Sequence, residues 1–168
     1  MKRLFTVCSV IGLLVIGALA AGASPADFSG TWVLNKAKSE GLNERMASVD
    51  ITMVVKQDAK QLTTETTYAG GQREMPPQKA VYNLDGSETT VEMGGRMPGK
   101  AMLKAKWMNE GKTLELNSVR QVNVQGNDAT ITSQEHWELA DGGKTLKAHR
   151  VSESPRGKQE STYVYTKK

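Results

Sequence analysis

Three charged residues stand where a β-sheet protein ordinarily carries apolar side chains. Arg120, Glu135 and Arg150 fall within alternating series of Leu, Val, Ile, Trp and Ala residues on three consecutive predicted strands. Alternate side chains of a strand point to the same face, so this pattern places the three charges on the inward face. Consecutive strands of a meander are neighbours, and we therefore expect these side chains to meet on one interior wall.

Two kinds of chemistry fit such a wall. A guanidinium binds a carboxylate or similar anion through parallel hydrogen bonds, so an arginine in excess of the glutamate predicts recognition of an anionic ligand. The alternative is an internal salt bridge near an open mouth, or a bulge that turns one arginine outward. Aromatic residues on these and neighbouring strands would supply the remaining walls. The candidate ligand-binding residues are Arg120, Glu135, Arg150, Trp107, Trp137, Tyr163 and Tyr165.

Other reactive residues do not form a recognisable site by spacing. His136 and His149 have outward parity on adjacent predicted strands, and no third residue with metal-ligand spacing accompanies them. The single cysteine, Cys8, lies in the first segment of the chain, and no Gly-x-Ser-x-Gly nucleophile motif occurs. We therefore expect a protein that is not an enzyme and that carries no metal and no cofactor.

The elements that must position these residues are strands. From Val49 onward apolar residues recur mostly with a period of two, and turn signals such as Asp85-Gly86 separate the runs. One hairpin motif occurs twice, at residues 109–114 and 141–146. In each copy an acidic, glycine-containing turn precedes Lys-Thr-Leu. We expect one all-β domain over residues 24–168, a single antiparallel up-and-down barrel of about eight to ten strands. A short helix is expected after the first strand, over Ala37–Ser48.

The start of the chain has the layout of a secretory signal peptide. Met1-Lys2-Arg3 precedes an almost wholly apolar run, and two small-x-small sites end at Ala20 and Ala23. We expect cleavage after Ala23, with Ala20 as the alternative, and hence a periplasmic or secreted protein. The other interpretation is a retained membrane anchor, because the run approaches the ~20 residues that a spanning helix needs. After cleavage we expect no stable membrane anchor.

Charge excludes one class of partner. The 168 residues carry a formal net charge of +4, and Lys2 and Arg3 supply two of these charges. The predicted mature domain is therefore only weakly basic. Nucleic-acid-binding proteins usually show a concentrated basic stripe, so we expect no nucleic-acid partner.

The beginning of the predicted domain carries a family resemblance. The string Phe28-Ser29-Gly30-Thr31-Trp32-Val33-Leu34-Asn35 places a Gly-x-Trp on the first strand, with Lys38-Ser39 after it. It resembles the lipocalin-like (calycin) barrels, and in particular small secreted bacterial proteins of that group. The resemblance implies that Trp32 and Gly30 are structural, with Trp32 closing one barrel end near a basic residue from a late strand. The Arg-x-Tyr device of fatty-acid-binding proteins is absent from the last strand.

These patterns favour an exported, non-catalytic protein that binds a small, largely apolar or amphipathic ligand inside its barrel. Burial of apolar surface would supply affinity, and an interior arginine would orient an anionic head group. The alternative is a cell-envelope or secreted interaction protein with a filled barrel and no small-molecule ligand. A lined interior cavity discriminates between the two.

Overall fold

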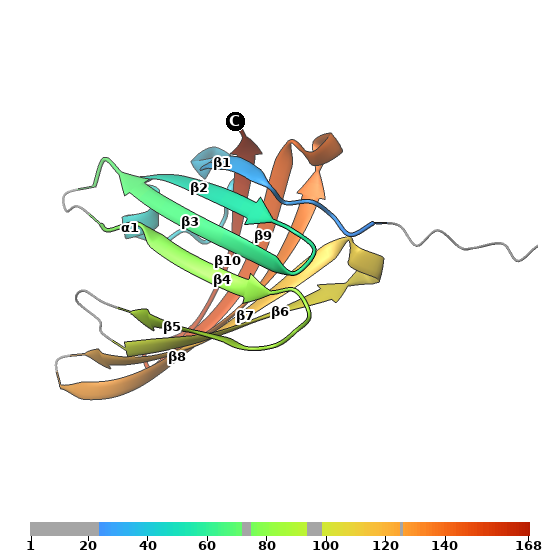
Figure 1. Cartoon of the computed structure of the whole chain (residues 1–168). Helices are drawn as coiled ribbons and strands as arrows, with labels where there is room; N and C mark the ends of the chain where they lie inside the picture. Colours follow the sequence, from blue (N-terminus) through green and yellow to red (C-terminus); the bar gives the residue numbers. More distant parts are fainter. Residues whose placement is uncertain (1–23, 72–74, 94–98, 125) are drawn as a thin grey trace, which may run out of the picture.

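A computed structural model describes residues 24–71, 75–93, 99–124 and 126–168, and the predicted signal peptide lies outside these ranges. Ten antiparallel strands form one sheet in the order β4-β3-β2-β1-β10-β9-β8-β7-β6-β5. The sheet curls into a nearly closed barrel, which confirms the predicted fold class (Figure 1). The strands are β1 (Gly30–Leu34), β2 (Asp50–Gln57), β3 (Gln61–Ala69), β4 (Gln78–Asn83), β5 (Thr89–Met93), β6 (Gly99–Met108), β7 (Thr113–Val124), β8 (Asn127–Ala140), β9 (Thr145–Ser154) and β10 (Gly157–Lys167). The helices are η1 (Lys36–Lys38), α1 (Glu44–Ala47), η2 (Asn109–Gly111) and η3 (Asp141–Gly143).

The first strand, β1, pairs with the last strand, β10. In β1, Trp32 stands opposite Met53 of β2 and opposite Lys167 of β10. The two edge strands, β4 and β5, follow one another in the chain, and within the described ranges no β-ladder joins them. Every other pair of strands that is consecutive in the chain is hydrogen-bonded, so the barrel is an up-and-down meander.

The strands form because their side chains alternate between core and solvent. In β2, Ile51, Met53 and Val55 are buried while Val54 between them is exposed, which gives the period of two expected for a sheet with one buried face. Strand β6 repeats the pattern: Ala101, Leu103 and Ala105 are buried, whereas Lys100, Lys104 and Lys106 are exposed.

The two repeated sequence segments form matching hairpin turns. Asn109 and Asp141 both adopt positive φ values, 48° and 52°, at the start of η2 and η3. Each side chain then bonds the threonine that opens the next strand: Asn109 Nδ2 donates to Thr113 Oγ1 at 3.0 Å, and Thr145 Oγ1 donates to Asp141 Oδ2 at 2.6 Å. Asn and Asp tolerate this left-handed conformation better than most residues, which explains their use here.

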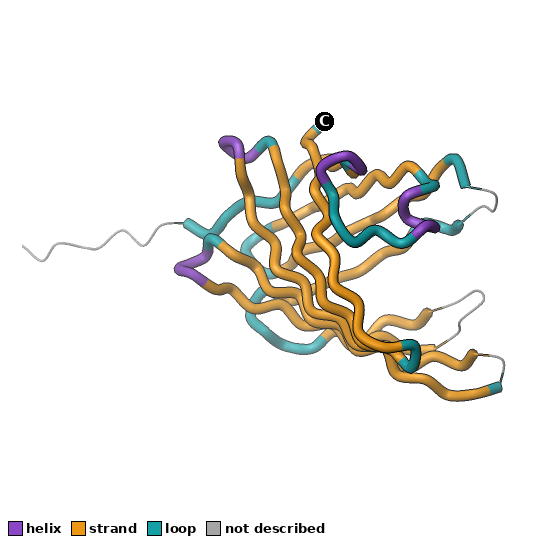
Figure 2. Tube along the Cα trace, turned by 180° about the vertical axis from the view of Figure 1, so that it is seen from behind, coloured by secondary structure: helices purple, strands orange, loops and turns teal. Residues whose placement is uncertain are grey.

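The single helix predicted over Ala37–Ser48 is wrong in extent. The segment holds two short helices, η1 and α1, shown in purple in Figure 2. Gly41 lies between them with a φ of +67°, and an added Cβ there would collide with the backbone of Glu160 on β10. Glu40 also forms a β-bridge with Thr162. Pairing with β10 therefore replaces the middle of the predicted helix.

Aromatic residues fill one end of the barrel. Phe28 and Trp32 are fully buried, and the Trp32 indole N–H donates to the Phe28 carbonyl at 2.8 Å. The Phe28 ring stacks on Trp107 at 6.1 Å and meets Trp137 edge-on at 5.7 Å. Lys167 of the last strand lies over the Trp32 ring, with its Nζ 5.1 Å from the centroid. Such a contact adds a cation–π attraction to apolar burial.

Gly30 makes room for that lysine. A Cβ at Gly30 would meet the Lys167 side chain, and the φ of this glycine is +143°. Its missing side chain lets Lys167 cross the strand and reach the Trp32 ring.

No helix in the described ranges is both long and apolar enough to span a lipid bilayer.

Candidate functional site

The three interior charges predicted from sequence do face one cavity. Glu135 on β8 stands directly opposite Arg150 on β9, and Arg120 on β7 points into the same space. The cavity has a volume of about 150 Å³. Its lining comprises Met46, Ile51, Met53, Thr64, Thr66, Tyr68, Gln78, Lys79, Ala80, Tyr82, Arg120, Glu135, Trp137, Ala148, Arg150, Tyr163 and Tyr165.

The ion pair in this cavity leaves hydrogen-bonding capacity unused. Arg150 Nε lies 3.7 Å from Glu135 Oε1, and the two side chains are 27% and 24% exposed. The other carboxylate oxygen, Oε2, accepts the Trp137 indole N–H at 2.9 Å. Arg150 Nε is buried and has no hydrogen-bond partner in the described structure. Buried donors are rarely left unpaired, and here Glu135 compensates the charge of Arg150 without forming a hydrogen bond to Nε.

Arg120 is also available to an anion. No described carboxylate lies within ion-pair distance of its guanidinium. Lys79, the other cation of the lining, is paired with Glu65 at 3.5 Å and is largely exposed. The cavity interior therefore carries two arginines against one glutamate.

Four tyrosines surround these charges. Burial raises the pKa of both Tyr82 and Tyr165, and the negative charge of Glu135 acts in the same direction. Burial also raises the pKa of Tyr68, against the opposing effect of Arg120 and Arg150. The Tyr163 and Tyr165 rings lie 6.4 Å apart with a tilt of 37°. The phenols of Tyr68, Tyr82 and Tyr165 therefore stay neutral at physiological pH. All four tyrosines offer ring faces and O–H groups to a ligand.

The structure separates Trp107 from the other predicted residues. Arg120, Glu135, Arg150, Trp137, Tyr163 and Tyr165 line the cavity, whereas Trp107 packs against Phe28 and does not reach it. Sequence reasoning missed Tyr68 and Tyr82, which come from β3 and β4 across the barrel. Tyr68 shares the alternating face of Leu62, Thr64 and Thr66, so the same parity argument could have found it.

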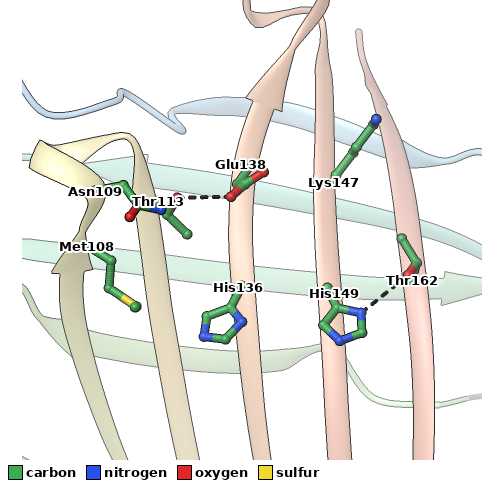
Figure 3. Close-up of a pocket in the computed structure, with 8 residues that line it drawn as sticks. All are labelled: Met108, Asn109, Thr113, His136, Glu138, Lys147, His149 and Thr162. Atoms are coloured by element: carbon green, nitrogen blue, oxygen red, sulfur yellow. Dashed lines mark hydrogen bonds between the residues drawn. The ribbon is translucent and has the colours of Figure 1, made fainter.

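A second hollow lies on the outside of the barrel. It is an open groove of about 350 Å³ over β6 to β10, and His136 and His149 stand directly opposite one another in it (Figure 3). Each imidazole bonds outward to its own neighbours, His136 to Glu115 at 3.2 Å and His149 to Thr162 at 3.5 Å. Among the residues that the structure describes, no cluster of three or more metal-ligating side chains occurs. The interior cavity, with its buried charges, is therefore the candidate site.

Glu115 of β7 lies beside the groove, with its carboxylate 3.2 Å from His136 Nε2. Hydrogen bonds from Asn117 and then from His136 lower the pKa of Glu115 below its usual value of 4.5. A carboxyl group with a lowered folded-state pKa adds stability above its unfolded pKa and loses that contribution as pH falls through the lowered value.

The Glu115→Gln variant is therefore expected to lose less stability than the parent protein when the pH is lowered from 7 to 3. Urea unfolding at the two pH values measures the difference. Glu153→Gln, at an exposed position of β9, is the matched control and should behave like the parent. Equal acid sensitivity of parent and Glu115→Gln would contradict this assignment.

Comparison with known proteins establishes the fold and no closer relationship. No family model matches the sequence. No curated protein matches it either.

Solved structures do match the barrel. The ileal bile acid-binding protein of zebrafish, crystallised with cholic acid, superposes with a TM-score of 0.54 at 14% identity, covering 84% of this chain and 98% of that one. A secretory abundant heat soluble protein of Ramazzottius varieornatus superposes with a TM-score of 0.52 at 12% identity, covering 83% and 94%. The chain therefore has the architecture of the calycin-type β-barrels.

Proposed function

We propose that this protein binds a small, largely apolar or amphipathic ligand inside its barrel and performs no catalysis. The observation that carries the proposal is an interior cavity that holds two arginines against one glutamate and is lined by Trp137 and tyrosines. Apolar and aromatic walls supply affinity, and a few convergent polar groups fix orientation. Arg150 and Arg120 orient an anionic head group.

Two further observations support binding over catalysis. The zebrafish neighbour is a bile acid-binding protein crystallised with cholic acid, so a barrel of this architecture holds a small amphipathic molecule. In this chain both Glu135 oxygens already face the Arg150 and Trp137 nitrogens, and burial raises the pKa of Tyr82 and Tyr165. These groups suit fixed hydrogen bonding better than proton transfer.

Export is part of the proposal. The leader of residues 1–23 would be removed, which delivers the barrel to the periplasm or the exterior. The Gly30-x-Trp32 string and the signal-like leader together support membership of the small secreted bacterial proteins of the lipocalin-like group.

Native mass spectrometry of the protein purified from its own exported fraction tests this function. We expect an additional mass that disappears after organic extraction. The Arg120→Gln variant should retain less of that molecule, whereas Lys106→Gln, on the outer face of β6, should retain as much as the parent. A clean apo mass, with no thermal shift across fatty acids, isoprenoids, porphyrins and small aromatic acids, would favour the filled-barrel interaction protein instead.

A further inference from the structure

The size of the interior cavity limits its ligand. Its volume is about 150 Å³. Pockets for drug-sized ligands usually measure about 300–1,000 Å³. An engineered apolar cavity of about 150 Å³ in another protein holds one benzene molecule. This volume therefore matches a single six-membered ring with one substituent better than a sterol skeleton or a long acyl chain.

The walls favour an aromatic ring over an aliphatic chain. Five aromatic side chains line the cavity, and two of them, Trp137 and Tyr165, are buried. The others are Tyr68, Tyr82 and Tyr163. Aromatic rings gain from offset-stacked and edge-to-face contacts with such side chains.

The charges favour an acid. Two arginines oppose one glutamate in the cavity interior, and that glutamate already accepts the Trp137 indole N–H at 2.9 Å. The Arg150 Nε–H is the buried donor without an acceptor. A planar carboxylate presents two oxygens to a guanidinium at matching spacing, so it can bind the accessible nitrogens of these arginines and neutralise the excess charge.

We propose that the ligand is a one-ring aromatic carboxylate, with its ring among the cavity tyrosines and its carboxylate on Arg150 and Arg120. This inference rests on the proposed binding function and deepens it by naming the ligand class. It also separates this protein from its zebrafish structural neighbour, which was crystallised with cholic acid.

Isothermal titration calorimetry with benzoate and 4-hydroxybenzoate tests the proposal on the purified protein. Benzamide keeps the ring and removes the charge, cyclohexanecarboxylate keeps the charge and removes the aromatic face, and cholate and decanoate test size. We expect benzoate or 4-hydroxybenzoate to bind at least about tenfold more tightly than benzamide. A hydrogen bond to a charged group contributes a binding free energy of that size. Cyclohexanecarboxylate should bind more weakly than benzoate, and cholate and decanoate should not bind.

Arginine variants test where the carboxylate of the ligand binds. Arg150→Gln and Arg120→Gln should each weaken benzoate binding by about tenfold and leave benzamide binding unchanged. Lys147→Gln, on the outer face of the same strand as Arg150, is the matched control and should bind like the parent. Two arginine variants are used so that one remains informative if the other fails to fold. A benzoate affinity that is unchanged by both substitutions would overturn this placement of the carboxylate.

The remaining outcomes separate the two proposals. Binding of cholate or decanoate without binding of either aromatic acid overturns the inference and leaves the binding function standing. No binding of any of these probes, together with a clean apo mass from the exported fraction, overturns both. Tight benzoate binding that is lost in both arginine variants supports both.

Discussion

The Trp32→Ala variant is expected to lose about 3–5 kcal/mol of the free energy of unfolding, which is the usual cost of truncating a buried tryptophan to alanine. Trp32 is fully buried, its indole N–H bonds the Phe28 carbonyl, and Lys167 lies over its ring. Truncation removes the apolar contacts, the hydrogen bond and the cation–π contact together. Because small domains are stable by only about 5–15 kcal/mol, this single change removes a large share of the total.

Urea unfolding followed by far-UV circular dichroism measures this loss without relying on tryptophan fluorescence. Val54→Ala is the control, because Val54 lies on the neighbouring strand β2 and faces outward, 37% exposed. That change should alter the free energy of unfolding by no more than about 0.5 kcal/mol. A Trp32→Ala loss below about 1.5 kcal/mol would show that the barrel end does not depend on this side chain.

The Glu135→Leu variant is expected to lose about 2–3 kcal/mol of the free energy of unfolding. The change removes the counter-charge of Arg150 and the acceptor of the Trp137 indole N–H, because one Glu135 oxygen faces Arg150 and the other accepts from Trp137. The cost lies below that of a fully buried pair, since the ion pair spans 3.7 Å and both side chains keep partial solvent contact.

A second substitution separates the ion pair from simple packing. Replacing both partners, as Glu135→Leu with Arg150→Met, should recover at least half of the lost stability, because the uncompensated arginine is then gone. The double variant keeps Arg120 and should bind benzoate about tenfold more weakly than the parent, as Arg150→Gln does. A double variant no more stable than Glu135→Leu would show that the two charges are not coupled. Urea midpoints and calorimetry on the same preparations report the two effects separately.

Local patterning was enough to predict the barrel and much of its lining. The period of two in β2 and β6 marks which side chains face the core, and the turns at Asn109 and Asp141 follow from residues that tolerate positive φ. The inward parity of Arg120, Glu135 and Arg150 required only that consecutive strands be neighbours. These features are properties of single strands or of adjacent pairs, which is why the sequence contains them.

Sequence reasoning failed where contacts between distant segments determine the local structure. The expected helix over Ala37–Ser48 is interrupted because Glu40 bridges Thr162 and Gly41 approaches the backbone of Glu160, more than a hundred positions further along the chain. No local propensity registers such a partner.

The cavity itself belongs to the tertiary structure. Alternation states which face a side chain occupies, and it does not state how far along the barrel axis that side chain lies or what stands across from it. Trp107 has the correct parity and yet packs on Phe28 at the barrel end, while Tyr82 enters from β4 on the far wall. The volume enclosed, and the unpaired Arg150 Nε within it, follow only when the sheet curls and brings β3 and β4 to face β8, β9 and β10.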